Sequence, residues 1–408
     1  EYFTTTFSDA TVEPSDSVEV VFQFAPTEQV SEATSTATIV ASGVNNQTVT
    51  LWTGWFPLVW HVATTGSDST GDGSIDNPFA TIQTAIDTAG EGDTVLVSAG
   101  TYFENLIWPN TNGIKLIGIG DTTNTIIDGS NADASVIFMY PSSDTLIDTT
   151  TLIDNFRIIN GSGTPMFGFG PVGGGLLIRE AGPSLKNLYI AENTAVTGAA
   201  MMIVGSNSVL DGIIITNNVI YSGNEYGWNG HLNDIQGCSL QLNNIKIINN
   251  AGLGVSNPRN GFQFINNEYL EFSNIFISEN HELHGLTIAY YNDSDADVSL
   301  INVEIENNYS GLSLDWRDSH LLENISIHDN DSIGLSLNFM TLADSTAELE
   351  NLALYNNNPN LRIYMGYEAL SSTVSHLTSV NGDINSYQAE WHQLTIINSI
   401  IDLNTDHN

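Results

Sequence analysis

A nine-residue pattern of apolar residues and asparagines recurs along most of the 408-residue chain. Its clearest copy runs from Leu185 to Asn193 and reads Leu-x-Asn-Leu-x-Ile-x-x-Asn. Copies separated by 22 to 32 residues begin at Ile153, Leu185, Leu210, Leu242, Phe272, Leu300, Leu322, Leu349, Val374 and Ile396. A repeat of this length is typical of a solenoid, in which each coil buries its apolar face only against its neighbours.

The spacing within each repeat indicates strands. Apolar and polar residues alternate with a period of two, which excludes arrays of paired helices. The Asn residues suit turns with left-handed backbone, and stacked Asn side chains can form amide ladders. A second strand is predicted in three coils, at Gly285–Tyr290, Gly311–Trp316 and Gly334–Phe339, with Leu and aromatic residues inward and Ser or Thr outward. The repeats therefore predict an all-β chain that forms a right-handed parallel β-helix.

The segment from Trp60 to Glu104 predicts a cap on the first coil. A short helix is expected from Pro78 to Ala89, with Asn77 as its N-cap and one apolar face. The sequence Asp-Asn-Pro-Phe-Ala-Thr-Ile-Gln-Thr-Ala-Ile-Asp, followed by Gly-Asp-Thr-Val and Ala-Gly-Thr-Tyr-Phe-Glu, resembles the N-terminal cap of pectate-lyase-like β-helices. The resemblance implies that residues 58–107 are the cap and first coil of a β-helix domain spanning 58–408.

Residues 1–57 have a different character. Short strands are predicted at Val18–Phe24, Ala37–Ala41 and Val49–Trp52, separated by turn-rich stretches. The turn Glu13-Pro14-Ser15-Asp16 and the strand ending Phe24-Ala25-Pro26 resemble the C-terminal half of choice-of-anchor immunoglobulin-like surface domains. A complete sandwich of that kind has about seven strands. We therefore expect a partial immunoglobulin-like segment.

The charge balance excludes several partners. Subtracting 47 acidic from 8 basic side chains gives a net charge of −39. Binding to nucleic acid or to anionic lipid depends on clustered Lys and Arg, so neither is expected. The sequence contains no run of 18 apolar residues, so no membrane-spanning segment is predicted. The single cysteine, Cys238, excludes an intrachain disulfide and is expected to be a small buried residue.

The resemblance implies that a polysaccharide lyase or hydrolase must be considered, but catalytic patterns in the sequence are weak. Arg157, Lys246 and Glu304 share one outward column, although apolar and aromatic residues interrupt it. Glu306 and His328 are expected to lie one strand spacing apart as an acid–histidine pair. Asp315 and Arg317 are further catalytic candidates. The sequence assigns none of these residues as catalytic.

A mixed cluster of histidines, acids and a tryptophan is the best small-site candidate. Its members are His281, His284, Asp315, Trp316, Arg317, Asp318 and His320. An aromatic insertion containing Tyr226, Trp228 and His231 could stack on sugar rings or cover a coil edge. Ligand binding is assigned to Tyr226, Trp228, His231, His284 and Asp318.

A glycine-rich loop before the predicted helix carries Asp68, Asp72 and Asp76. Carboxylate oxygens are the ligands that Ca²⁺ prefers, although this spacing is not that of an EF-hand. The loop is therefore a possible calcium site, and a plain polar turn is the alternative. No other cofactor is expected.

Two functional hypotheses follow. The first is a secreted or cell-surface β-helix with a structural, adhesive or filament-forming role that can bind carbohydrate. The alternative is a carbohydrate-active lyase or hydrolase, for which fold analogy is the only support. Unpaired strand edges and the partial segment 1–57 predict either head-to-tail self-association or pairing with a preceding domain.

Overall fold

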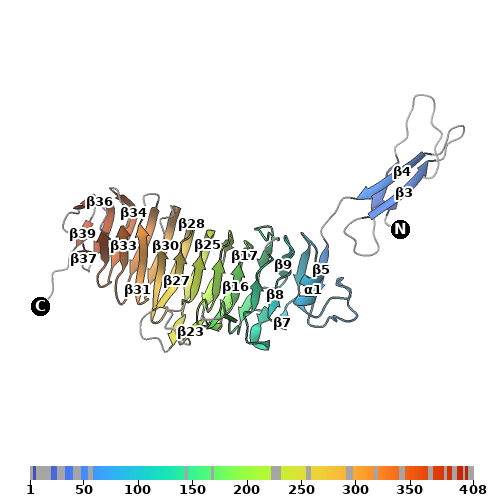
Figure 1. The fold of residues 1–408 in the computed structure, drawn as a ribbon, viewed down its shortest axis with the longest axis horizontal. Coiled ribbons are helices and arrows are strands. Elements are labelled where there is room, and N and C mark those ends of the chain that lie inside the picture. The colour runs from blue at the N-terminus through green and yellow to red at the C-terminus, as the bar shows by residue number, and fades with distance from the viewer. Residues whose placement is uncertain are drawn as a thin grey trace, which may run out of the picture.

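The computed structural model of this chain describes most of the repeat region and short pieces elsewhere. The described residues are 3–5, 20–24, 33–39, 47–53, 58–142, 146–166, 170–221, 231–253, 259–290, 297–316, 320–339, 345–365, 371–380, 384–387, 393–397 and 400–402. From β5 onward they form a right-handed parallel β-helix, as the repeats predict. Figure 1 shows the strands stacked as successive coils along the long axis.

The main sheet of the β-helix contains 19 strands. One run of parallel strands is β5 Val59–Val62, β6 Thr94–Val97, β9 Lys115–Gly118, β12 Leu152–Asp154, β17 Ser184–Lys186, β21 Val209–Asp211, β25 Ser239–Ile248, β28 Tyr269–Ser278, β30 Asp297–Glu306, β32 Leu321–His328, β34 Ser345–Tyr355, β36 Ser371–Val380 and β38 Gln393–Ile397. The rest are β7 Gly100–Phe103, β10 Thr125–Asp128, β13 Arg157–Ile159, β18 Tyr189–Ala191, β22 Ile214–Thr216 and β39 Ile400–Asp402. From β25 to β36, one long bent strand replaces the two short ones of each earlier coil.

The opposite wall is an 11-stranded parallel sheet, here called the second sheet. It consists of β8 Leu106–Ile107, β11 Ile137–Met139, β16 Leu176–Arg179, β20 Met201–Val204, β24 Asn233–Gln236, β27 Arg259–Ile265, β29 Leu283–Ala289, β31 Ser310–Trp316, β33 Leu335–Phe339, β35 Leu361–Met365 and β37 Ile384–Tyr387. The strands β29, β31 and β33 cover the predicted second strands. A short third sheet joins β19 Thr194–Ala195, β23 Val219–Tyr221 and β26 Ala251–Leu253.

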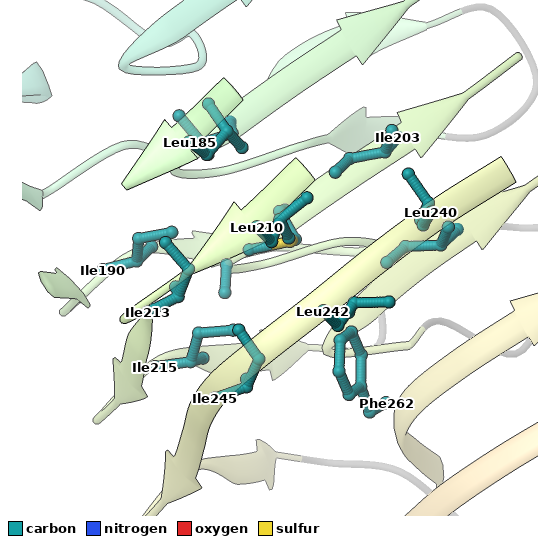
Figure 2. Packing of buried hydrophobic residues seen from close by; sticks show 14 of the residues in the cluster. Leu185, Ile190, Ile203, Leu210, Ile213, Ile215, Leu240, Leu242, Ile245 and Phe262 are labelled. Atoms are coloured by element: carbon teal, nitrogen blue, oxygen red, sulfur yellow. The ribbon is translucent and has the colours of Figure 1, made fainter. Parts of the chain in front are cut away.

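The hydrophobic core extends along the stack of coils. In it, side chains at the same repeat position lie above one another in columns. Leu185, Leu210 and Leu242 pair in register across three coils, and each side chain is almost fully buried. Figure 2 shows these leucines with the neighbouring isoleucines packed between the walls. Burial of each such side chain contributes about 1.5–3 kcal/mol. The predicted inward leucines of β31 are confirmed, since Leu312 and Leu314 are buried whereas Ser313 is not.

Two ladders of asparagine follow the repeat. The inner ladder, formed by the ninth-position residues, is buried and contains Asn193, Asn218, Asn250, Asn280, Asn308, Asn330 and Asn357. The outer ladder, formed by the third-position residues, is exposed and contains Asn244, Asn274, Asn302, Asn324 and Asn351.

The backbone of the two ladders corrects one expectation. The outer residues are left-handed, with φ of 58° at Asn274 and 57° at Asn302. At the inner ladder the left-handed residue is the one before the Asn, such as Asn249 or Glu279. The inner asparagines therefore serve the buried amide ladder, while the turn itself is made by the residue before them.

The cap helix is present but shorter than predicted. Helix α1 spans Ile82–Thr88, and its N-cap is Thr81 rather than Asn77. The residues before it are not helical, because Phe79 forms a parallel bridge with Val62. Ile82 and Ile86 are fully buried against β5 and β6, so the helix covers the start of the core, as Figure 1 shows.

Glu104 lies beside the first turn of α1. Its carboxylate accepts the N–H groups of Ile82 and Gln83 at 2.8 and 2.9 Å. Burial raises the pKa of this carboxyl, and the two hydrogen bonds oppose that shift. The carboxylate thereby satisfies donors that a helix N-terminus leaves unpaired.

The described parts of residues 1–57 form two antiparallel pairs. β1 Phe3–Thr4 pairs with β2 Gln23–Phe24, and β3 Ala33–Ile39 pairs with β4 Gln47–Thr53. The predicted strands at Ala37–Ala41 and Val49–Trp52 overlap β3 and β4. Most of the predicted strand Val18–Phe24 has no strand geometry among its described residues, and only its end belongs to β2.

Two further features of the described residues concern the single cysteine and membrane insertion. Cys238 is buried, and burial raises the pKa of its thiol to about 11. None of the described helices is long and apolar enough to cross a membrane.

Candidate functional site

A shallow groove runs over the outer face of the main sheet where its long strands bend. It measures about 370 Å³ and crosses β28, β30 and β32. We call it the outer groove; its lining residues are Asn274, Ile275, Phe276, Asn302, Val303, Glu304, Asn324 and Ser326. A second depression of about 300 Å³ involves Asp211, Gln241 and Asn243 on the two preceding coils and Glu271 on β28. Asn274 joins the two, because its Nδ2 donates to Oδ1 of Asn243 at 3.2 Å.

The outer ladder forms the floor of the groove. Nδ2 of Asn302 donates to Oδ1 of Asn274, and Nδ2 of Asn324 donates to Oδ1 of Asn302, both at 3.1 Å. The left-handed bend points these amides outward, and the coil repeat places them about 4.8 Å apart. The groove thus offers a regular row of donors and acceptors along the axis.

An aromatic ring lies next to this row. Phe276 pairs in register between Lys246 and Glu304 and is partly exposed. The Lys246 ammonium lies 5.4 Å from the centre of the Phe276 ring, at cation–π distance. Arg157, at the far end of the same column, is occupied elsewhere, because it forms an ion pair with Glu192.

A cluster of carboxylates surrounds His328 at the edge of the groove. The structure places Glu306 next to His328, with Oε2 of the acid 3.6 Å from Nδ1 of the ring. It also brings Glu304 to 3.3 Å from Nε2 and Asp329 to 2.8 Å from Nδ1. Tyr355 stacks on the ring with a centroid distance of 4.4 Å and an interplanar angle of 6°.

The sequence reasoning did not single out Asp329. Most coils have Asn or Glu at this eighth repeat position, and an Asp directly after a histidine was the available signal. The hydrogen bond to His328 lowers the pKa of Asp329, and a second bond from Asn356 adds to the effect. Asp329 is thereby favoured as a charged carboxylate.

Only part of the predicted small-site cluster on the second sheet lies within the described residues. Asp315 accepts the backbone N–H of Tyr290 and the Nδ2 of Asn338, so its oxygens link adjacent coils. Nδ1 of His284 lies 2.6 Å from Oγ of Ser310, and burial lowers the pKa of the imidazole.

Several predicted site residues lie outside the described residues. They are the ligand-binding candidates Tyr226, Trp228 and Asp318 and the catalytic candidate Arg317. His231 is described, and its carbonyl oxygen accepts the N–H of Gly198. Their proposed roles stay predictions.

One residue of interest on the second sheet was missed by sequence reasoning. Asp234 lies in an outward register column with Gln263 and Met202, yet only 3% of it is exposed. Burial raises its pKa to about 6, although Gln236 donates two hydrogen bonds to the carboxylate. Alternation alone assigned this position to solvent, and the sequence holds no signal for its burial.

The three acids of the predicted calcium loop do not converge on one point. Asp68 accepts the N–H groups of Ala80 and Thr81 just before helix α1. Asp72 accepts the N–H of Ser74, and the hydrogen bonds from Ser74 lower its pKa. Among the described residues, the group of three or more potential ligands that lies within metal-binding distance is Glu304, Glu306 and His328, and not this loop. Calcium binding by Asp68, Asp72 and Asp76 stays a prediction.

No family model and no curated protein matches the sequence. Solved structures with a similar fold include the A-module of a mannuronan C-5 epimerase from Azotobacter vinelandii. The two chains are 13% identical over 79% of this chain and 95% of the epimerase module, with a TM-score of 0.48.

Two further solved structures are similar to this chain. A rhamnogalacturonan lyase is 13% identical over 86% of this chain and 88% of its own, with a TM-score of 0.40. A polygalacturonase from Erwinia carotovora is 12% identical over 85% and 97%, with a TM-score of 0.34. Identities this low carry no information on chemistry, so the function must be argued from the chain's own side chains.

Proposed function

We propose that this protein is a non-catalytic β-helix module that binds a neutral polysaccharide along the outer groove. The observation that carries this proposal is the outer ladder, which presents amide donors and acceptors at coil spacing beside the partly exposed ring of Phe276. Sugar hydroxyls pair with amides of this kind, and the apolar face of a sugar ring packs on an aromatic side chain.

The negative charge of the chain favours a neutral polysaccharide over an acidic one. The chain carries a net charge of −39, and Glu304 lies in the groove itself. An anionic glycan would approach a surface of the same sign, which opposes association at physiological salt. A neutral glycan meets no such barrier, because its hydroxyl groups need only hydrogen-bond partners.

Affinity electrophoresis against neutral and acidic polysaccharides tests the proposal. We expect retardation by at least one neutral polysaccharide, reduced severalfold in Phe276→Ala and Asn302→Gly. Ser313→Ala, on the second sheet, is the matched control and should behave as wild type. Retardation by acidic polysaccharides alone, or equal binding by all variants, would contradict the assignment of the groove.

Asp234 favours a second candidate function, a carbohydrate hydrolase acting on the second sheet. A carboxyl whose pKa is raised to about 6 suits a general acid. Release of reducing sugar during the same polysaccharide panel, abolished by Asp234→Asn, would establish this alternative. The absence of release together with binding would support the non-catalytic module.

We further propose an extracellular or cell-surface location, with residues 1–57 as part of an immunoglobulin-like surface domain and an adhesive or filament-forming role. The antiparallel pairs β1–β2 and β3–β4 suit such a segment. Head-to-tail association is the assembly expected from unpaired strand edges. Light scattering of the purified chain tests it: a mass that grows with concentration supports association, and a strict monomer contradicts it.

A further inference from the structure

The residues around His328 have the construction of a metal site. The imidazole ring is held between coils, with only 9% of its side chain exposed. Its two nitrogens face different partners: Nδ1 faces Asp329 at 2.8 Å, and Nε2 faces Glu304 at 3.3 Å. The glutamates come from β30 and the histidine from β32, so the cluster bridges adjacent coils.

The hydrogen-bond partner of Nδ1 determines which ring nitrogen of His328 is available to bind a metal. A carboxylate only accepts hydrogen bonds, so the short contact with Asp329 assigns the ring proton to Nδ1. Nδ2 of Asn356 donates to the other oxygen of Asp329 at 2.9 Å and holds that carboxylate in place. This is the arrangement by which metal-binding histidines are usually oriented, with the second nitrogen bonded to a carboxylate.

A metal ion that takes the place of a proton on Nε2 would be bound on the side of the ring that faces Glu304. Oε1 of Glu304 lies 3.3 Å from this nitrogen. In a tetrahedral zinc site with bonds of 2.0–2.1 Å, neighbouring ligand atoms lie roughly 3.3 Å apart. The separation of these two atoms therefore already suits a bound metal.

Glu306 provides the third ligand. One oxygen atom from each glutamate and one ring nitrogen lie within 4.8 Å of one another. Ser278 donates to Oε1 of Glu306 at 3.1 Å, and Oε2 of Glu306 lies 3.6 Å from Nδ1 of the histidine. The side chain of Glu306 is partly exposed, and its carboxylate rotates from the Nδ1 side of the ring toward Nε2 to complete the set.

We propose that His328 Nε2, Glu304 and Glu306 bind a divalent transition metal of the zinc class, with Asp329 as the positioning residue. The donor set of one imidazole and two carboxylates favours such a metal over Ca²⁺, which takes six to eight oxygen ligands. Three protein ligands leave a fourth position for water. Bound metal would tie β30 to β32. The site shares Glu304 with the outer groove, but the proposal of a metal site does not rest on polysaccharide binding.

Isothermal titration calorimetry of the chelator-treated full chain with ZnCl₂ at pH 7.5 tests the proposal. We expect one equivalent to bind in the wild type, with affinity reduced on the order of a hundredfold in His328→Asn and about tenfold or more in Glu304→Gln and Asp329→Asn. Glu323→Gln, on the same strand as His328 but outside the cluster, should bind zinc as the wild type does. CaCl₂ should give no comparable binding.

A second readout guards against misfolded variants. Zinc should raise the Tm of the wild type and of Glu323→Gln, but not that of His328→Asn, because only a metal bound to the folded state stabilises it. Glu304 is half-exposed, so Glu304→Gln should keep the Tm of the metal-free wild type. No stoichiometric binding by the wild type, or equal binding by His328→Asn and Glu323→Gln, would overturn the site.

Discussion

The side-chain amide of Asn280 donates to the side-chain oxygen of Asn308 at 2.9 Å, and both residues are almost fully buried. The same Nδ2 also donates to the carbonyl oxygens of Ile247 and Ser278. Oδ1 of Asn280 in turn accepts both the backbone and side-chain N–H groups of Asn250. Each amide of the inner ladder thus satisfies buried polar groups on both adjoining coils.

Asn280→Ala should therefore be strongly destabilising. The substitution leaves the backbone N–H of Asn250 without its acceptor, whereas Nδ2 of Asn250 keeps the carbonyl oxygens of Ile215 and Ile248. It also removes the side-chain donor to the carbonyl oxygens of Ile247 and Ser278. Each buried group left unpaired costs about 1–3 kcal/mol, so we expect a total loss of roughly 3 kcal/mol or more. Urea denaturation followed by circular dichroism measures the change.

Asn302→Gly in the outer ladder is the control for this prediction. Asn302 is exposed and left-handed, and glycine adopts that backbone without strain. Gly212 already takes the corresponding position of an earlier coil, with φ of 70°. We expect a change of about 1 kcal/mol or less. Equal losses for both variants would show that burial of the inner ladder is not what makes it necessary.

Leu312→Asp and Ser313→Asp test the inward and outward assignment of β31. Leu312 is 2% exposed and lies in register with Leu286 and Leu335, so a charge there has no partner or water. We expect Leu312→Asp to lose more than about 3 kcal/mol and Ser313→Asp less than about 1 kcal/mol. Thermal denaturation of the two variants side by side distinguishes them, and similar Tm values would contradict the assignment.

Asp234 should make stability depend on pH. Its pKa in the folded protein is raised to about 6 from an ordinary value of 3.8, because burial disfavours the charged form. The folded state therefore binds this proton more tightly, and the contribution to stability falls as pH rises from about 4 through 6. The decrease amounts to about 3 kcal/mol at most.

Asp234→Asn should remove that component while keeping an oxygen for Gln236 to bond. We expect the variant to gain stability relative to the wild type at pH 7.5 but not at pH 4, as judged from urea midpoints. The same pH dependence in both proteins would show that Asp234 is not buried as a protonated acid.

The solenoid could be predicted because its determinants are local and repeated. The alternation around Leu312 fixes which side chains point inward, and the asparagine spacing fixes where each coil turns. The start of α1 was misplaced because Asn77 and Pro78 are good helix-start residues, whereas the bridge between Phe79 and Val62 keeps these residues out of the helix. That pairing depends on tertiary contact and has no local signal.

The sites were harder to predict because they depend on register between coils. The position of Glu306 beside His328 could be predicted, because the two residues occupy the same repeat position in adjacent coils and pair in register. Asp329 adds its carboxylate from the turn, where strand alternation gives no direction for a side chain. Asp234 lies at an outward position of the repeat but is buried, which alternation does not predict.

The most direct test of the central claim is a crystal structure of this protein with a neutral oligosaccharide taken from the polysaccharide that it retains in affinity electrophoresis. We expect the sugar chain to lie in the outer groove, with one ring against Phe276 and hydroxyl groups bonded to Asn274, Asn302 and Asn324. A sugar chain bound on the second sheet beside Asp234, with the outer groove empty, would contradict the account.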